Sequence, residues 1–300
     1  MRLLHLARPS GLRSPLRGML VYALALFFFA GMDAASKYLA LRHSVPLVAW
    51  TRYFVHLLWM TAIFMPSMGR QLVHAQRPHW VLLRGACLIG ITVFMMLALR
   101  RLPLAEATSI VYLAPLLVVL LARPILHERI GRLRWFAVLG GFAGVLLIIR
   151  PGGDLDPLGV ACALLVALCM TAYQLFTRVL SYSENAVSML YYSALLGSVV
   201  FGVLLPWFWF SEMPSLLEIL LYLCLGSFGF FGHLCFTLAF RDAPASVLAP
   251  ISYAQLLWAA LLGWLAFEQV PDALSVLGML VITAGGVVVA LAERRRAQAG

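Results

Sequence analysis

The chain has 300 residues, of which 63% are hydrophobic and only 11% charged, and its mean hydropathy is +0.95. A soluble domain carries about 25% charged residues, so this composition excludes a soluble globular protein and indicates a polytopic membrane protein. The net charge of +10 does not indicate a nucleic-acid partner, because most arginines lie in short connections and near the two ends rather than in a basic stripe with interleaved aromatics.

Ten apolar runs follow one another along the chain, most of them close to the roughly 20 residues that a helix needs to cross a bilayer. Helices are predicted at 18–40, 46–66, 79–99, 103–126, 133–150, 157–179, 186–207, 215–240, 244–267 and 273–292. Prolines and glycines mark the breaks, and no connection is long enough to hold a soluble domain. The predicted fold class is therefore an all-α polytopic membrane protein with ten transmembrane helices.

The first run contains an unexpected pair of charges. Residues 31–39 read GMDAASKYL, which places Asp33 and Lys37 four residues apart inside an apolar helix. Asp33 lies about 22 Å along this helix and Lys37 about 6 Å further. Ionisable side chains inside a membrane are energetically costly and mark candidate functional groups.

Two later helices bring further charges to the same predicted depth. Arg52 lies about 9 Å into its helix, and Glu106 lies near the start of the fourth helix. Together with Asp33 and Lys37 they form two acids and two bases at one level. They are interpreted either as a salt-bridge cluster that seals the outer end, or as a gate or binding site whose ion pairs exchange partners. Lys37 could also snorkel to the interface.

Arg52, His56 and Trp59 fall on one face of the second helix, since they are spaced at i, i+4 and i+7. A guanidinium there can bind a substrate carboxylate, and Trp50 or Trp59 can stack on an organic cation or a ring. His56 is open to two interpretations, a proton carrier or a satisfied buried histidine.

The second half of the chain carries neutral polar side chains where the first half carries charges. The candidates are Tyr173, Gln174, Tyr191, Ser252, Tyr253 and Gln255. Some of the tyrosines are also open to interpretation as headgroup anchors. Pro115 and Pro250 each free a backbone carbonyl within a helix, which is tolerated where the break lines a cavity. Together these residues predict a central pocket with aromatic walls for a small amphipathic metabolite.

Three further features have structural interpretations. Arg84 lies near the end of its helix and is expected to snorkel to the interface. Gly140 and Gly144 form a GxxxG close-packing face, which fits a monomer or a homodimer. The five cysteines lie in apolar runs without CxxC spacing, so no disulfide, metal site or cofactor is predicted.

Arginine placement predicts the orientation. With the N-terminus in the cytoplasm, fourteen arginines fall on the cytoplasmic side and four in the opposite loops, in agreement with the positive-inside rule. Residues 1–17 and 293–300 are then basic cytoplasmic tails. The first run resembles a signal peptide, but an uncleaved helix is predicted, since its loss would leave nine spans and break an internal repeat.

That repeat aligns MLALRRLPLAEA (96–107) with TLAFRDAPASVL (237–248), so that Pro103 matches Pro244, 141 positions later. The halves are two copies of one five-helix unit, 18–150 and 157–292. Five is odd, so the second copy enters the membrane from the opposite side. Inverted repeats of this kind are the architecture of alternating-access carriers.

The repeated pattern resembles the drug/metabolite transporter superfamily, in particular proteins with two EamA-type domains. The residues that carry the resemblance are ALRRLPLAEATSIVYLAP, LHERIG and GGFAGVLLI in the first half, and AFRDAPASVLAPISYAQLLWAALLGWLAFEQVPD and ITAGGVVV in the second. The resemblance covers nearly all of 18–292. It departs at Pro115, because the nearest proline of the second half, Pro250, lies earlier in its helix.

The resemblance implies a secondary carrier of the bacterial inner membrane, most often an exporter of a small amino-acid-like or zwitterionic metabolite. Some relatives carry S-adenosylmethionine or riboflavin inward, and others release opine-type metal chelators, so substrate and direction stay open. The expected partners are a small-molecule substrate and membrane lipid. Proton coupling is a hypothesis that rests on Asp33, Glu106 and His56.

Other function classes lack their motifs. The chain has no GxxxxGK phosphate loop, which argues against an ATP-driven pump. The segment GSFG (226–229) does not match the GxSG of an intramembrane serine protease, and no HExxH occurs. A non-enzyme is therefore predicted, with a non-transporting receptor or scaffold as the alternative of another class.

Overall fold

The computed structural model describes residues 15–114, 116–118, 121, 132–149, 154–180, 183–209, 213–242, 248 and 251–299. Within these residues the structure is helical, with short connections and no strand. The helices are α1 (Pro15–Ala40), α2 (Val45–Met68), α3 (Pro78–Leu99), α4 (Leu104–Val111), α6 (Arg132–Ile149), α7 (Pro157–Leu180), α8 (Ala186–Leu204), α9 (Leu216–Asp242), α11 (Ala254–Phe267) and α12 (Ala273–Ala299). Two short 3-10 helices, η2 (Gly69–Gln71) and η3 (Leu205–Trp207), follow α2 and α8.

Six helical segments are long and apolar enough to cross a membrane. They are Leu16–Ala40, Val45–Gln71, Pro78–Leu99, Pro157–Thr177, Ala186–Trp207 and Leu216–Ala239. Four shorter apolar helices lie at Leu104–Val118, Leu139–Ile149, Ala254–Phe267 and Ala273–Gly285. A polytopic membrane protein is thereby confirmed, whereas ten full spans stay a prediction.

Most helix ends lie within a few residues of the predicted ones, because proline marks their first turns. Pro46 and Pro78 occupy the first turns of α2 and α3, where a missing N–H costs nothing. The Asn185 side chain caps α8 by accepting from the Val187 N–H. The larger differences are at the predicted runs 103–126 and 244–267, which contain Pro115 and Pro250. Both prolines lie outside the described residues.

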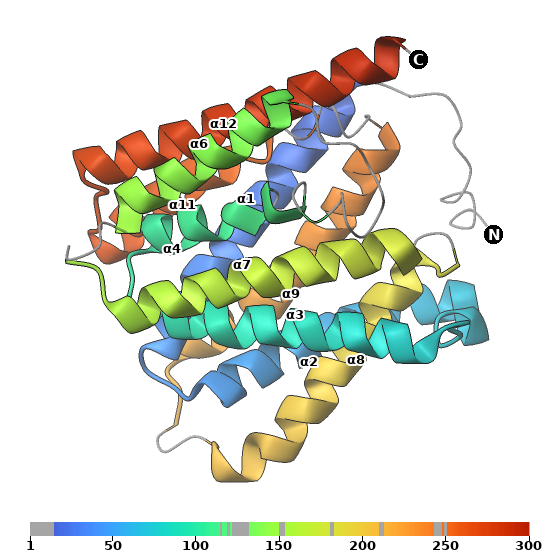
Figure 1. Ribbon diagram of the computed structural model, residues 1–300. Helices are drawn as coiled ribbons and strands as arrows, with labels where there is room; N and C mark the ends of the chain where they lie inside the picture. Colours follow the sequence, from blue (N-terminus) through green and yellow to red (C-terminus); the bar gives the residue numbers. More distant parts are fainter. Residues whose placement is uncertain are drawn as a thin grey trace.

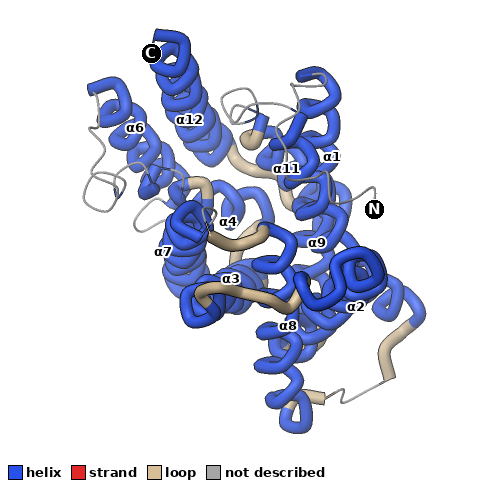
Figure 2. The backbone as a smooth tube through the Cα atoms, turned by 90° about the vertical axis from the view of Figure 1, so that its right-hand side faces the viewer, coloured by secondary structure: helices blue, strands red, loops and turns tan. Residues whose placement is uncertain are grey.

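Helices from the two halves of the chain pack against each other in pairs. Figures 1 and 2 show α6 alongside α12 and α3 alongside α7, and α1 packs along α9 in the same way. In addition, α2 contacts α8 and α9, α8 contacts α3, and α11 contacts both α1 and α4, while α4 contacts α7. The bundle is thus built from contacts between the halves.

The helix contacts correspond to one another in pairs when each helix of the first half is matched with one of the second. The first-half helices α1, α2, α3, α4 and α6 are matched, in that order, with α7, α8, α9, α11 and α12. The α1–α9 contact then corresponds to α7–α3, α2–α9 to α8–α3, and α1–α11 to α7–α4. The glycines show the same relation: a Cβ on Gly85 would meet Ser193 and Leu196, and one on Gly226 would meet Arg52 and Val55. Each residue of the first contact lies 141 positions from its counterpart in the second, which is what two copies of one packed unit produce.

The α6–α12 contact uses one glycine of the predicted GxxxG face. A Cβ on Gly144 would lie 2.8 Å from the Gly278 carbonyl oxygen, and a Cβ on Gly278 would lie 2.6 Å from the Gly144 carbonyl oxygen. Gly140 faces open space, with nothing within 4 Å of its built Cβ. Close backbone approach is the usual reason for glycine in membrane helix contacts. Gly144 therefore serves a contact within the chain.

Candidate functional site

The centre of the bundle brings together Asp33 of α1, Tyr112 after α4 and Gln255 of α11. The Tyr112 hydroxyl donates to the Ser252 carbonyl oxygen at 2.6 Å and to Gln255 Oε1 at 3.2 Å. The Gln255 side chain in turn hydrogen-bonds the Asp33 carboxylate. Because the oxygen of the Gln255 amide accepts from Tyr112, the NH₂ group of the same amide is directed to Asp33. This network holds the predicted Asp33, Ser252 and Gln255 in one place.

The two discontinuous helices meet at equivalent residues. Tyr112 is a turn residue after α4, and Ser252 and Tyr253 form the turn before α11. Tyr112 and Tyr253 are 141 positions apart, and their ring centroids are 5.2 Å apart. Irregular backbone and polar side chains therefore coincide at these tyrosines, whereas the breaks predicted at Pro115 and Pro250 lie outside the described residues.

Arg52 of α2 is buried and bound to α3. Its Nη1 donates to Thr92 Oγ1 at 3.1 Å, and the Tyr53 hydroxyl lies 2.7 Å from the same oxygen. Asp33 is near enough to interact electrostatically with Arg52. Each of these two charges is nevertheless hydrogen-bonded to a neutral group, Asp33 to Gln255 and Arg52 to Thr92.

Lys37 and Glu106 form a second polar group, at the end of the bundle where α1 and α3 finish. The buried Lys37 ammonium donates to the Leu102 carbonyl oxygen and lies 5.4 Å from the Phe267 ring centroid. Glu106 accepts from Ser275, but its buried Oε2 has no hydrogen-bond partner among the residues that the structure describes. Lys37 and Glu106 interact electrostatically.

A single salt-bridge cluster of the four predicted charges is not formed. Among the described residues the ion pairs join Arg17 to Asp242, His43 to Glu218 and Arg101 to Asp156. The physical reason is the crossing of the helices, which directs Asp33 toward α11 and Lys37 toward the start of α4. The structure thus separates the four charges into two pairs, Asp33 with Arg52 and Lys37 with Glu106, and each pair consists of one acid and one base.

His56 and Trp59 lie on the predicted face of α2, but their surroundings differ. His56 is buried and packs edge-on to Phe230 with ring centroids 5.8 Å apart, and its Nε2 has no hydrogen-bond partner in the described part of the chain. Its ring centroid is 5.9 Å from that of His233. Trp59 is 37% exposed and donates to Ser227 Oγ at 3.0 Å, so its indole is held at the α2–α9 surface.

The remaining predicted residues lie outside these networks. Trp50 stacks on Phe54 with centroids 4.8 Å apart. Tyr191, its counterpart in the second half, is buried in an apolar cluster with Met60 and Phe230. Gln174 is half-buried on α7. A substrate contact of Tyr191 stays a prediction.

Arg84 corrects a prediction. Its side chain does not snorkel but is only 3% exposed. Its Nε donates to Thr177 Oγ1 at 2.6 Å, and its Nη1 to Ser193 Oγ at 3.1 Å and to the Met189 carbonyl oxygen at 3.2 Å. Its Nη2 donates to the Tyr173 hydroxyl. Hydroxyl groups of α7 and α8 lie close to α3 and accept the hydrogen bonds of Arg84, so its guanidinium is satisfied without reaching the membrane interface.

Several interior residues of these networks are not among the site residues predicted from the sequence, including Tyr112, Thr92 and Arg84. Tyr112 had a usable signal, since it lies 141 positions before the predicted Tyr253. Thr92 had none, because a threonine in an apolar helix most often bonds its own backbone. It does so here through Leu88 at 3.0 Å while also accepting from Arg52.

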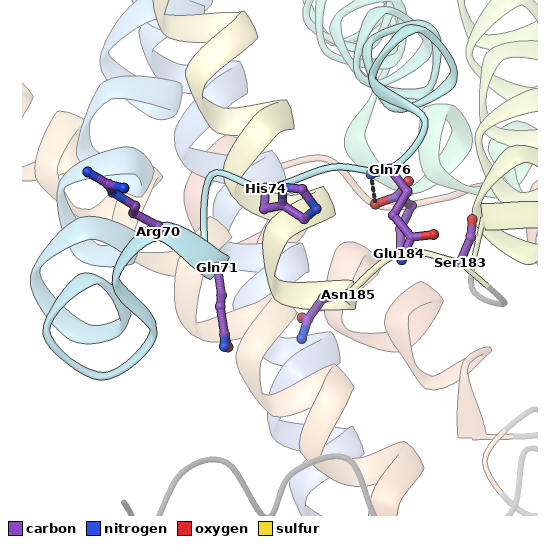
Figure 3. A pocket seen from close by; sticks show the side chains of 7 residues that line it. All are labelled: Arg70, Gln71, His74, Gln76, Ser183, Glu184 and Asn185. Atoms are coloured by element: carbon purple, nitrogen blue, oxygen red, sulfur yellow. Dashed lines mark hydrogen bonds between the residues drawn. The ribbon is translucent and has the colours of Figure 1, made fainter.

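A polar cavity of about 400 Å³ opens at the other end of the bundle, between the α2–α3 and α7–α8 connections. The residues that line it are Arg70, Gln71, His74, Gln76, Ser183, Glu184 and Asn185 (Figure 3). Glu184 closes one side by accepting from the backbone N–H groups of Gln76 at 3.1 Å and Arg77 at 2.6 Å. The carboxylate thereby ties the start of α3 to the α7–α8 connection.

The sequence profile of the EamA-like transporter family matches residues 16–150 and again residues 157–291. The chain belongs to the EamA-like transporter family. The two matches divide the chain at the boundary predicted for the internal repeat. Membership establishes a membrane transporter.

Several curated relatives match over almost their whole length. An S-adenosylmethionine uptake transporter of Rickettsia prowazekii is 27% identical over 95% of this chain and 96% of its own. A riboflavin transporter of Vibrio cholerae is 27% identical over 89% and 91%, and a pseudopaline exporter of Pseudomonas aeruginosa is 27% identical over 88% and 93%. One solved crystal structure shares the fold, with a TM-score of 0.66 at 21% identity over 92% of this chain and 98% of that one.

Proposed function

We propose that this protein is a secondary transporter that moves a small zwitterionic metabolite across the bacterial inner membrane by alternating access. One observation carries the proposal. Asp33 and Arg52 carry opposite charges and interact electrostatically, yet within the described residues their side chains hydrogen-bond neutral groups, Gln255 for Asp33 and Thr92 for Arg52. Charges held this way inside a membrane protein are available to a ligand of opposite charge.

A zwitterion supplies both missing charges. Its ammonium or sulfonium group would bind the Asp33 carboxylate, and its carboxylate would bind the Arg52 guanidinium in a charge-assisted hydrogen bond, which is stronger than the bond to Thr92. The Tyr112 and Tyr253 rings, 5.2 Å apart, supply an aromatic wall beside Asp33. This arrangement favours an amino-acid-derived compound.

Replacing Arg52 with Ala tests this assignment. Transport by the protein in liposomes is expected to fall by at least about a hundredfold, because the solute carboxylate loses the guanidinium that would bind it and each tenfold loss corresponds to about 1.4 kcal/mol. The matched control is Arg101→Ala, which removes a half-exposed arginine that pairs with Asp156. Normal transport by Arg52→Ala would show that Arg52 does not bind the solute and contributes only to packing.

Export of an amino-acid-derived compound, including an opine-type chelator, is the direction that the family resemblance favours. Uptake of S-adenosylmethionine or riboflavin is the second candidate, supported by the relatives that carry those names. Exchange of S-adenosylmethionine, riboflavin and pseudopaline in liposomes, together with metabolite profiling of cells with and without the protein, separates these candidates. A protein that moves no solute in either assay would favour a receptor or scaffold.

Proton coupling belongs to the same proposal and rests on Glu106. Its buried Oε2 lacks a hydrogen-bond partner, so the carboxyl group can accept a proton without first breaking a bond at that oxygen. Transport by the wild type is expected to respond to an imposed pH gradient, and transport by Glu106→Gln to lose that response. Wild-type rates that ignore the gradient would remove the coupling and leave the carrier.

A further inference from the structure

We propose that Arg84 is a second binding station for the anionic group of the solute, near the opposite end of the interior from Arg52. This inference rests on the proposed function, because it takes the solute to carry a carboxylate. Arg52 lies about 10 Å from the start of α2, and Arg84 about 9 Å from the start of α3. Since these helices begin at opposite ends of the bundle, the two guanidinium groups serve opposite faces.

The charge of Arg84 has no counter-charge in the described part of the chain. Its partners are the hydroxyls of Thr177, Ser193 and Tyr173 and the Met189 carbonyl oxygen, all of them neutral. The ion pairs of the described residues join other groups. A buried charge without a counter-charge is costly, and simple packing of α3 against α7 and α8 would be served as well by an apolar side chain.

A solute carboxylate can take the place of the neutral acceptors of Arg84. Thr177 Oγ1 donates to the Tyr173 carbonyl oxygen at 2.7 Å, and Ser193 Oγ donates to the Met189 carbonyl oxygen at 3.0 Å. Both hydroxyls thus spend their hydrogen on the preceding helical turn and present lone pairs to the guanidinium. A carboxylate forms stronger, charge-assisted bonds to the same N–H groups, so an arriving solute can exchange with these hydroxyls.

The surroundings of Arg84 repeat those of Arg52. Each guanidinium donates to a hydroxyl oxygen whose own hydrogen is donated to a carbonyl one turn back, Thr92 for Arg52 and Ser193 for Arg84. Each also lies over a tyrosine ring, Tyr53 at 5.5 Å for Arg52 and Tyr173 at 4.2 Å for Arg84. Arg52 and Arg84 are therefore chemically similar binding stations.

The position of Ser193 relates the two stations. It is the residue 141 positions after Arg52, and both lie at glycine contacts that correspond between the halves, with Gly226 against Arg52 and Gly85 against Ser193. Where the first half carries its own arginine, the second half carries a serine, and Arg84 reaches that serine from α3. Corresponding sites in the two halves therefore each hold one guanidinium.

Electrostatic interactions of the side chains between them link the regions around the two stations. His233 interacts electrostatically with both Arg52 and Arg84, and the Tyr53 and Tyr173 phenols interact with each other. At its own end, Arg84 bonds the Met189 carbonyl, which lies about one helical turn from Asn185 at the polar cavity. A carboxylate entering from that end would meet Arg84 before Arg52.

Sided transport kinetics test the proposal. Full-length protein in oriented liposomes is assayed with S-adenosylmethionine, riboflavin and pseudopaline presented from each face in turn. Arg84→Gln is expected to raise the KM about tenfold or more from the face that carries the α7–α8 connection, and less than about threefold from the other, with the reverse for Arg52→Gln. Arg84→Lys keeps the charge and is expected to restore most of the loss.

Tyr192→Phe is the matched control at the same end of the bundle, since it removes a hydroxyl that donates to the Val73 carbonyl oxygen at 2.8 Å and leaves Arg84 and its acceptors unchanged. It is expected to lower the melting temperature but to leave the KM from both faces within about twofold. An unchanged KM in Arg84→Gln, or an equal rise from both faces, would overturn the station and leave Arg84 as a structural anchor.

A second measurement applies if the wild type moves none of the three probes, a result that would count against the proposed substrates. The probe is then sodium acetate, compared with sodium chloride at equal ionic strength, and the readout is the melting temperature of the purified protein. Acetate is expected to raise it in the wild type and to raise it less in Arg84→Gln. An acetate shift that is absent, or equal in both proteins, would overturn the inference about Arg84.

Discussion

Tyr112 joins the two halves of the chain through one hydroxyl. It donates to the Ser252 carbonyl oxygen and to Gln255 Oε1, and the Gln255 amide then bonds Asp33. The order of this chain matters, because the hydrogen bond from the phenol to the Gln255 oxygen favours the orientation in which the amide NH₂ group points to the carboxylate. Tyr112 thus positions an acidic group that it does not contact.

Tyr112→Phe is expected to reduce transport by about tenfold while costing only about 1 kcal/mol of stability, the usual net value of one neutral hydrogen bond. The control is Tyr192→Phe, whose hydroxyl donates to the Val73 carbonyl oxygen at 2.8 Å in the α2–α3 connection. It should cost similar stability and leave transport intact. Liposome transport and thermal melting check both, and equal transport by the two variants would exclude the positioning role.

At the scale of single elements, the two glycines of α6 make opposite predictions. Gly144→Ala would place a Cβ 2.8 Å from the Gly278 carbonyl oxygen, so α6 and α12 must separate, at a cost of about 1–3 kcal/mol. Gly140→Ala meets nothing within 4 Å and should stabilise the helix by up to about 1 kcal/mol. Melting temperatures should therefore move in opposite directions. Equal shifts would contradict the α6–α12 contact.

The start of α7 depends on one carboxylate outside the membrane-spanning segments. Asp156 pairs with Arg101 at 2.8 Å and accepts from the Leu158 N–H at 2.8 Å. The hydrogen bond from Arg101, followed by that from Leu158, lowers the pKa of Asp156 below its ordinary 3.8. Its stabilising effect is therefore present above pH 3.8 and is lost as the pH falls through the lowered pKa.

Asp156→Asn should melt below the wild type at neutral pH, because it loses the ion pair with Arg101 while keeping a side chain that can cap α7. The difference should shrink as the pH is lowered past 3.8, when the wild-type carboxyl also becomes neutral. Melting curves over pH 3–7 measure this. A difference that stays constant over that range would show that the charge of Asp156 does not stabilise α7.

For the whole molecule, the exchange of helix contacts between the halves is the main support for two copies of one unit. Ten spans, an even number, would put both ends of the chain on one side, and arginine placement predicts that this side is the cytoplasm. Reporter fusions near residues 17 and 292 should both report the cytoplasm. Reporters on opposite sides would exclude ten spans and the inverted repeat together.

The sequence predicts the starts of helices better than it predicts the hydrogen-bond partners of their side chains. Pro46 and Pro78 predict the starts of α2 and α3, because proline is tolerated in a first turn and disfavoured further in. Lys37 is recognisable as an unusual charge, but its partner, the Leu102 carbonyl, is 65 residues away. Arg84 was misplaced because a helix end predicts snorkelling unless a neighbouring helix supplies acceptors, and no local pattern shows that neighbour.

The amino-acid sequence by itself determined the membrane environment, the helices that carry the charges and the duplication of the chain, because hydropathy, proline positions and repeated motifs are properties of residues near one another along the chain. Only the tertiary structure decided that Asp33 turns to Gln255, that Arg52 and Arg84 bind neutral hydroxyls, and that four charges form two pairs. The reason is that hydrogen-bond partners are chosen by how the helices cross. That crossing depends on close contacts such as Gly144 with Gly278, which join residues far apart in the sequence.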